Sequence, residues 1–146
     1  MTQLKHKDYM KMAMGLAEQA AAAGDVPVGA LVVLDGKIIG KGFNRREAGQ
    51  NATAHAEIIA INEACENLGR WRLNDCTLYV TMEPCPMCAG AIVLARMKTL
   101  VFGCNDSNWG GCGSVFNIAQ HPKLNHNMEV IGGICEEECR QQVRDF

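Results

Sequence analysis

The sequence predicts an α/β fold in which helices cover both faces of one mixed β-sheet. Segments with strand-like and helix-like patterns alternate along most of the 146 residues, an order typical of sheets flanked by helices. Two strand-like runs near the N-terminus are separated only by Asp35-Gly36, a strong hairpin signal. A strand–helix–strand unit over 76–102 should instead form a parallel pair with a right-handed crossover. An antiparallel hairpin and a parallel unit together imply a mixed sheet.

The N-terminal half predicts a helix, a hairpin and a second helix. Apolar residues recur at spacings of three and four in the first segment, and Gly24 follows as a stop signal. Thr53 is the predicted N-cap of the second helix, and Gly69 ends that helix. In order, the expected elements are a helix from Tyr9 to Ala20, strands over 28–34 and 37–43, a polar loop over 44–51 and a helix over 54–67.

The C-terminal half predicts further strands and helices around a glycine-rich loop. Residues 76–82 are rich in β-formers, which favour a strand. Pro86 suits the first turn of a helix, where a backbone N–H has no partner. In order, the expected elements are strands over 76–82 and 99–102 with a helix over 86–96 between them, a glycine-rich loop over 103–113, a short helix over 114–119, a short strand over 128–131 and a helix over 134–143.

Length and composition indicate a single domain, residues 1–146, that can build its own core. The formal net charge of −2 argues against a chain that coats nucleic acid non-specifically, but it allows a local basic patch. No apolar run approaches the roughly 20 residues of a membrane helix, so no membrane partner is expected. The segment from Met1 to Tyr9 is polar and lacks the apolar core of a secretory signal, which makes the cytoplasm the expected compartment.

The eight cysteines are expected to be reduced, because the chain shows no export signal and promises an adequate core without disulfides. A closely spaced pair then indicates a metal site or catalysis. Four of the others are interpreted as small buried apolar residues rather than a second zinc site: Cys104, Cys112, Cys135 and Cys139.

Two short motifs, each at the start of a predicted helix, form the candidate metal site. A His-Ala-Glu motif begins at His55, and a Cys-Pro-Met-Cys motif runs from Cys85 to Cys88. Both sulfurs of such a pair at a helix start point toward the same turn, and the exposed N–H groups there favour thiolates. If the two helix starts face one point, His55, Cys85 and Cys88 can hold one zinc ion per subunit.

Glu57 is the candidate proton carrier beside that ion. Three protein ligands leave the fourth position of zinc to water, the pattern of catalytic sites, whereas structural zinc sites are closed with four ligands. Zinc lowers the pKa of such a water toward about 7. Glu57 follows His55 by two residues, so it can take the proton of this water and return it to a substrate. The combination H-x-E and P-C-x-x-C is a known signature of zinc nucleobase deaminases, and it predicts hydrolytic deamination.

Longer stretches carry a resemblance to a known family. They are Asp25-Val-Pro-Val-Gly-Ala30, Thr53-Ala-His-Ala-Glu57, Trp71-Arg-Leu73, Cys76-Thr-Leu-Tyr-Val-Thr81, Glu83-Pro-Cys85, Met87-Cys-Ala-Gly90, Val101-Phe-Gly103, Gly113-Ser114 and Asn125-His126. Over about 9–146 the chain resembles the bacterial tRNA-specific adenosine deaminases, members of the cytidine/deoxycytidylate deaminase superfamily. Cytosine, guanine and deoxycytidylate deaminases share the zinc motif, so residues 101–126 are the more discriminating part.

The resemblance implies a fold, a reaction and a partner. The fold is a cytidine-deaminase-like three-layer α/β/α sandwich with a mixed five-stranded sheet. The reaction is the zinc-dependent hydrolysis of adenosine to inosine at the wobble position (34) of a tRNA anticodon, in an arginine tRNA. The partner is the tRNA anticodon stem-loop, bound by a homodimer to which both subunits contribute contacts.

The resemblance also assigns contacts with a flipped base. It implies that the Asn44 side chain, the Ala56 backbone N–H and Asn125 bind the substrate. The sequence departs from the family pattern at Ala52 and Pro86, where many members have proline and valine. Neither position is a proposed ligand, so the implied chemistry is unaffected and only inferences about the loops are weakened.

Basic residues near Asn44 are the first candidates for contacts with the RNA backbone. Arg45 and Arg46 directly follow Asn44 and are the preferred pair. Trp109 on the glycine-rich loop is expected either to stack on a neighbouring base or to pack across a subunit interface. Further candidates, most of them expected to be only solvated, are Lys41, Arg70, Arg72, Arg96, Lys98, Arg140 and Arg144.

Two other functions stay open at this point. One is a deaminase of a free nucleobase such as guanine or cytosine, which the slightly acidic net charge favours. The other is a zinc-stabilised RNA-binding module without catalysis, which requires four protein ligands on the metal.

Overall fold

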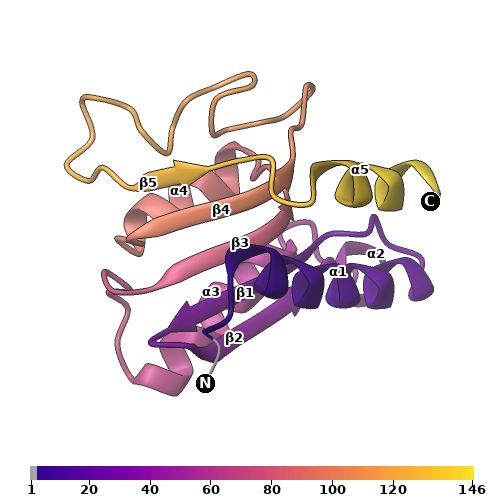
Figure 1. Ribbon diagram of the computed structural model, residues 1–146, viewed down its shortest axis with the longest axis horizontal. Coiled ribbons are helices and arrows are strands. Elements are labelled where there is room, and N and C mark those ends of the chain that lie inside the picture. Colours follow the sequence, from indigo (N-terminus) through magenta and orange to yellow (C-terminus); the bar gives the residue numbers. More distant parts are fainter. Residues whose placement is uncertain (1–2) are drawn as a thin grey trace.

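The computed structural model describes residues 3–146 and shows one mixed sheet between two layers of helices (Figure 1). The strands are β1 (Gly29–Leu34), β2 (Lys37–Phe43), β3 (Thr77–Met82), β4 (Thr99–Cys104) and β5 (Glu129–Ile131), and the helices are α1 (His6–Ala22), α2 (Arg46–Gly49), α3 (Ala56–Leu68), α4 (Pro86–Leu94) and α5 (Glu136–Arg144). The strand order is β2-β1-β3-β4-β5. β1 pairs antiparallel with β2 and β3, whereas β4 pairs parallel with β3 and β5. The predicted sandwich with a mixed five-stranded sheet is confirmed; residues 1 and 2 of the predicted domain lie outside the described range.

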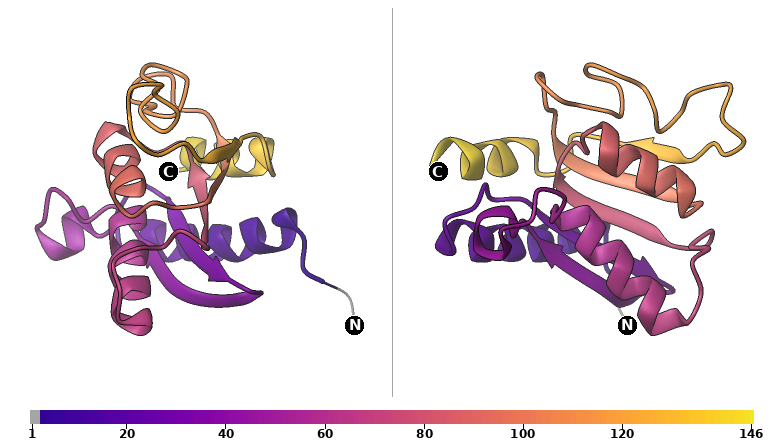
Figure 2. Two further views of the ribbon diagram at one scale, coloured as in Figure 1. Left: turned by 90° about the vertical axis from the view of Figure 1, so that its left-hand side faces the viewer. Right: turned by 180° about the vertical axis from the view of Figure 1, so that it is seen from behind.

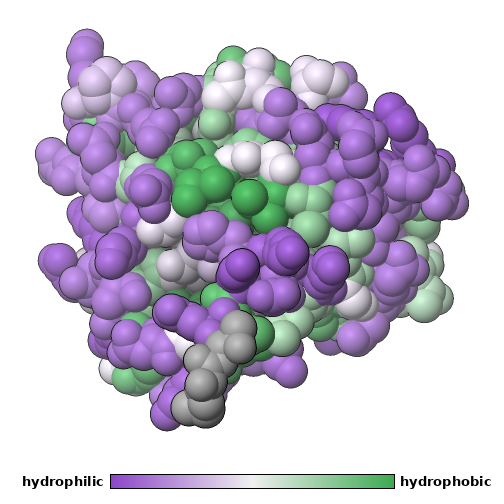
Figure 3. Space-filling view, in the orientation of Figure 1, coloured by the Kyte–Doolittle hydropathy of each residue, from purple (hydrophilic) through white to green (hydrophobic). Residues whose placement is uncertain are grey.

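The two helical layers each bury a separate apolar core. Helices α1 and α5 cover one face of the sheet, and α3 and α4 cover the other (Figure 2). The surface over α1 and α5 is largely hydrophilic, with an apolar area near the middle of this face (Figure 3). Among the helices of residues 3–146, none has the length and apolar character to span a membrane.

A glycine on β2 determines how closely α3 lies on the sheet. An added Cβ at Gly42 would lie 2.9 Å from the Ala60 nitrogen and closer still to the Ala56 carbonyl oxygen. Such contacts are shorter than van der Waals distances, so only glycine fits there without moving the helix. The N-terminus of α3, which carries His55 and Glu57, is therefore held at a fixed depth on the sheet.

Most of the predicted elements are confirmed, with ends that shift by a few residues. Asp35 and Gly36 join β1 to β2 with positive φ angles of 49° and 77°, as a two-residue hairpin requires. β3, α4 and β4 form the predicted parallel unit. Gly69 ends α3 in the left-handed conformation, with φ at 65°.

Two predictions near residues 44–55 are wrong because distant side chains determine the local structure. The expected polar loop contains the short helix α2, and the Glu47 N–H within it donates to the buried Asp25 carboxylate at 2.9 Å. Thr53 is not the N-cap of α3; His55 occupies that position. The Asn44 carboxamide oxygen accepts the Ala56 N–H at 2.9 Å instead. This acceptor lies twelve positions earlier in the chain, where a capping pattern cannot reveal it.

The helix predicted over 114–119 is also wrong. Cys112 and Asn117 form an isolated bridge within an irregular segment. The Ser114 N–H donates to Glu83, and the Val115 and Phe116 N–H groups donate to the Gly110 carbonyl. These bonds point back into the loop, so the segment cannot form the i to i−4 bonds of a helix.

Candidate active site

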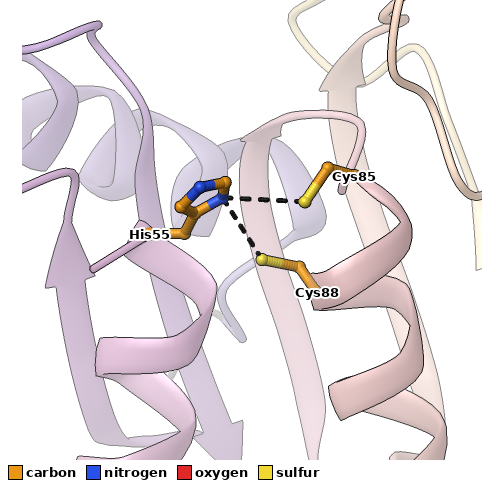
Figure 4. Close-up of side chains that lie close together, drawn as sticks. All are labelled: His55, Cys85 and Cys88. Atoms are coloured by element: carbon orange, nitrogen blue, oxygen red, sulfur yellow. Dashed lines mark hydrogen bonds between the residues drawn. The ribbon is translucent and has the colours of Figure 1, made fainter. Parts of the chain in front are cut away.

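The structure brings together the three predicted metal ligands from two helix starts. His55 is the N-cap of α3 and Cys85 is the N-cap of α4, both in extended conformation, and Cys88 lies in the first turn of α4. The Nδ1 atom of His55 lies 3.7 Å from the Cys85 sulfur and 3.5 Å from the Cys88 sulfur (Figure 4). The three ligand atoms all lie within 4.8 Å of one another. One metal ion can therefore contact all three.

The donor set fits zinc with one open position. An imidazole nitrogen and two thiol sulfurs are ligands that zinc prefers, and catalytic zinc sites keep three protein ligands. Within residues 3–146, no fourth histidine, cysteine, aspartate or glutamate joins this group. A closed structural site needs four ligands, so the arrangement disfavours a purely structural role.

Hydrogen bonds link the protonation of the three predicted ligands. Hydrogen bonds with Cys88 and, more weakly, with His55 lower the pKa of Cys85 to about 4, against the opposing effect of burial. The same Cys85 interaction raises the pKa of Cys88, and burial raises it further. Hydrogen bonding to Cys85 also raises the pKa of His55. A bound metal ion takes the place of these shared protons, because metal ligands must be deprotonated.

Glu57 lies in the first turn of α3 with only 4% of its surface exposed. Burial raises the pKa of its carboxyl group to about 7. A carboxyl group that titrates near neutral pH can both accept and donate a proton during a reaction. Glu57 lines the same cavity as His55 and Cys85, and its role as the proton carrier stays a prediction.

A cavity of about 540 Å³ opens beside the metal group, within the size range of small-ligand sites. Its lining includes Val26, Val28, Asn44, Arg46, Ala52, His55, Glu57, Met82, Glu83, Cys85, Pro86, Met87, Asp106 and Trp109. Asn44 donates from its Nδ2 to the Val26 carbonyl oxygen at 3.1 Å while its oxygen accepts the Ala56 N–H. The Ala56 N–H that was expected to contact a base is therefore bonded within the chain, and its contact with a substrate stays a prediction.

The other predicted contact residues lie at varied distances from the cavity. Arg46 and Trp109 line it, and Trp109 is 65% exposed. Arg45 is exposed without lining the cavity, and Asn125 is exposed on the segment between β4 and β5. Both stay predictions. Among the four cysteines expected to pack as apolar residues, Cys104 and Cys139 are buried, and the other two are half-buried.

Glu83 and Asp106 are cavity residues that the sequence analysis did not single out. Glu83 is 3% exposed and directly precedes the Pro-Cys pair that opens the metal motif. An acidic residue at the end of a buried strand is an unusual position, and this was the signal available in the sequence. Asp106 gave no such signal, because acidic residues are ordinary in polar loops.

Comparison with known proteins identifies the family. Residues 4–142 match the model of the MafB19-like deaminases. The chain is 50% identical over 138 residues to the tRNA-specific adenosine deaminase of Bacillus subtilis, covering 94% of this chain and 86% of that protein. The chain belongs to the tRNA-specific adenosine deaminase family. A second relative, the tRNA-specific adenosine deaminase of Haemophilus influenzae, is 47% identical over 94% of this chain and 80% of its own length.

Solved structures with the same fold agree with this family, and they include deaminases of two substrates, tRNA and guanine. A structure from a study of A-to-I editing by tRNA:A34 deaminases superposes with a TM-score of 0.89 and 40% identity, covering 92% of this deaminase and 98% of that chain. A guanine deaminase from Nitrosomonas europaea superposes with a TM-score of 0.79 and 25% identity, covering 95% and 82%. The fold is common to both, and the sequence similarity is greater to the tRNA deaminases.

Proposed function

We propose that this protein hydrolyses adenosine to inosine at the wobble position, residue 34, of a tRNA anticodon, with an arginine tRNA as the substrate. The observation that carries the proposal is the joining of a three-ligand metal group, a buried glutamate and a cavity in one site. Relatives that are 41–50% identical over 94% of the chain are tRNA-specific adenosine deaminases. The site supports the reaction class, and these relatives support the substrate.

The metal in this proposal is one zinc ion per subunit, held by His55 Nδ1 and the sulfurs of Cys85 and Cys88. When bound, zinc supplies a water molecule of lowered pKa as the nucleophile. The role of the Glu57 carboxylate is to accept a proton from the attacking water, whose oxygen bonds to C6 of adenine, and to deliver that proton to ring nitrogen N1. Glu57 then moves the second proton to the departing amino group. The C6–N6 bond breaks, and the products are inosine and ammonia.

The exposed side chains at the cavity mouth favour a substrate whose target base is already unstacked. Bases in a single-stranded anticodon loop can be flipped at low cost. The exposed Trp109 ring can stack on a neighbouring base, and Arg46 can contact a phosphate. Asn44 contacts the flipped base at the cavity wall in this proposal, and Arg45 and Asn125 contribute further contacts with RNA.

A homodimer is part of the proposal because α4 has an apolar outer face. This helix carries no charged residue, and an all-apolar helix normally lies in a protein interior. Yet Met87 is 38% exposed and Leu94 is 70% exposed on α4, with Phe116 of the irregular segment 49% exposed. A second copy of the chain covering α4 would bury these side chains. We place the reaction in the cytoplasm, where the eight free cysteines stay reduced.

Deamination of a free nucleobase is the second candidate function. The similarity to the guanine deaminase favours it, although that similarity is at 25% identity. The two functions differ in where ammonia is released: from a base within RNA or from a free base.

The test is to incubate the purified protein with total bacterial tRNA and to locate new inosine by sequencing. The proposal predicts inosine at position 34 and nowhere else, with one ammonia released per inosine. The Glu57→Ala variant, checked for full zinc content, should form none. Ammonia released from free guanine or cytosine faster than from tRNA would replace the proposal with the second candidate.

A further inference from the structure

Glu83 is a buried carboxylate that the reaction does not use. Its side chain is 3% exposed, and no salt bridge with it exists within residues 3–146. A buried charge without an ion pair needs several hydrogen-bond donors to be tolerated. The structure supplies four donors, all from residues 106–114.

The four donors divide equally between the two carboxylate oxygens. Oε1 accepts the Asp106 N–H at 3.1 Å and the Ser114 hydroxyl. Oε2 accepts the Cys112 N–H at 3.1 Å and the Ser114 N–H at 3.0 Å. These bonds tie both ends of the irregular segment 106–114 to one side chain. Gly110 allows this approach, because an added Cβ there would lie 2.6 Å from the Asp106 carbonyl oxygen and would also overlap the Glu83 carboxylate.

The segment 106–114 connects Glu83 with the mouth of the cavity. The Asp106 carboxylate accepts the N–H groups of Asn108 at 3.0 Å and Trp109 at 3.1 Å, which shapes the turn that carries the Trp109 ring. Trp109 and Asp106 both line the cavity. On the other side, Glu83 lies two residues before the ligand Cys85, and the Gly111 N–H donates to the Pro84 carbonyl at 2.7 Å. Residues 83–85 therefore include the metal ligand Cys85 and also form the hydrogen bonds that hold the segment 106–114.

We propose that Glu83 is a positioning residue that fixes the 105–116 loop against the metal motif and thereby sets the affinity for RNA, without taking part in proton transfer. This inference rests on the proposed function. Holding the loop requires a carboxylate, because a carboxylate accepts hydrogen bonds at both oxygens. An amide in its place must turn an NH₂ group toward either the Asp106 N–H or the Cys112 and Ser114 N–H groups.

The test compares Glu83→Gln with wild-type protein on an anticodon stem-loop RNA. Leaving one buried donor without a partner costs enough to shift a loop equilibrium by about tenfold or more. We expect KM to rise by about tenfold, while kcat changes by less than about twofold and zinc content is unchanged. Ser114→Ala, which removes one of the four donors, should raise KM by a smaller factor. Ser107→Ala is the matched control, since the Ser107 hydroxyl makes no hydrogen bond within the described residues.

Amide hydrogen exchange tests the loop independently of RNA. The N–H groups of Asp106, Cys112 and Ser114 should be protected in wild-type protein and exchange faster in Glu83→Gln, with α3 and β4 unaffected. A fall in kcat at constant KM, loss of zinc or unchanged exchange at these three amides would overturn the proposal. If wild-type protein forms no inosine in RNA, the proposed function fails, and the exchange measurement still decides whether Glu83 holds the loop.

Discussion

The two sides of the cavity are built in different ways. On one side, His55, Glu57 and Cys88 lie at the starts of regular helices that are packed on the sheet. On the other side, Trp109 lies on an irregular segment that is held by hydrogen bonds to the Glu83 and Asp106 carboxylates and to the Pro84 carbonyl. Under the proposed function, the helix starts carry the reaction and the loop contributes to the choice of substrate. Enzymes of one fold can then share their chemistry while differing in substrate.

The largest expected effect comes from a substitution on the side of the cavity formed by the starts of α3 and α4. Cys88→Ser replaces a buried thiol ligand by a poor one, so the protein should lose zinc and its activity should fall below detection. Zinc content by atomic absorption and inosine formation on the stem-loop RNA measure this. Cys65→Ser, which changes a half-buried cysteine outside the metal group, should keep both. A Cys88→Ser protein that retains full zinc and full turnover would show that the metal group is misassigned.

Glu57→Gln should have the next largest effect and should leave the metal in place. The amide keeps the size of the side chain but cannot accept the proton of water, so kcat should fall by about 10²–10⁴-fold. Single-turnover kinetics with quantified zinc measure the change. Wild-type rates at full zinc content would exclude Glu57 as the proton carrier.

A substitution on β2 beneath α3 tests whether the position of the α3 start depends on close packing of this helix on the sheet. Gly42→Ala places a methyl group 2.9 Å from the Ala60 nitrogen, so α3 must shift. Overpacking of this kind costs about 1–3 kcal/mol of the free energy of unfolding. Urea denaturation measures it. Gly15→Ala is the matched control, because its added methyl meets no atom within 4 Å, and it should stabilise α1 by about 0.5–1 kcal/mol. Equal destabilisation by both variants would contradict the assigned role of Gly42.

The smallest expected effect on folding is on the loop side. Trp109 is 65% exposed, so Trp109→Ala should change the free energy of unfolding by less than about 0.5 kcal/mol. Loss of a stacked base should nevertheless weaken RNA binding by about 1–3 kcal/mol. The Kd for the stem-loop RNA measures this, with Phe146→Ala as a control on another exposed aromatic ring. An unchanged Kd would mean that Trp109 does not contact the substrate.

The sequence predicted those parts of the molecule that depend on local pattern. The hairpin at Asp35-Gly36 and the helix stop at Gly69 follow from backbone preferences of single residues. The metal group was also predictable, because its ligands stand at the starts of two helices whose place in the fold follows from the strand–helix order. Trp109 was correctly singled out as a loop residue, but its place at the cavity mouth could not be derived.

The features that the sequence could not reveal depend on hydrogen bonds between distant segments. Asn44 occupies the Ala56 N–H that a local N-cap was expected to satisfy, and Asp25 organises α2. Glu83 accepts the Ser114 N–H at the start of the stretch 114–119, where local composition suggested a short helix. In each case one buried polar side chain satisfies backbone groups of another segment. The spacing of residues within a single segment cannot reveal such a hydrogen bond.

The most direct test of the division between the two sides is to measure kcat and KM for Glu57→Gln and Glu83→Gln on the same anticodon stem-loop RNA at full zinc content. The structure predicts that Glu57→Gln lowers kcat with little change in KM, and that Glu83→Gln raises KM with little change in kcat. If both variants change the same parameter by similar factors, chemistry and substrate selection are not divided between the helix starts and the loop.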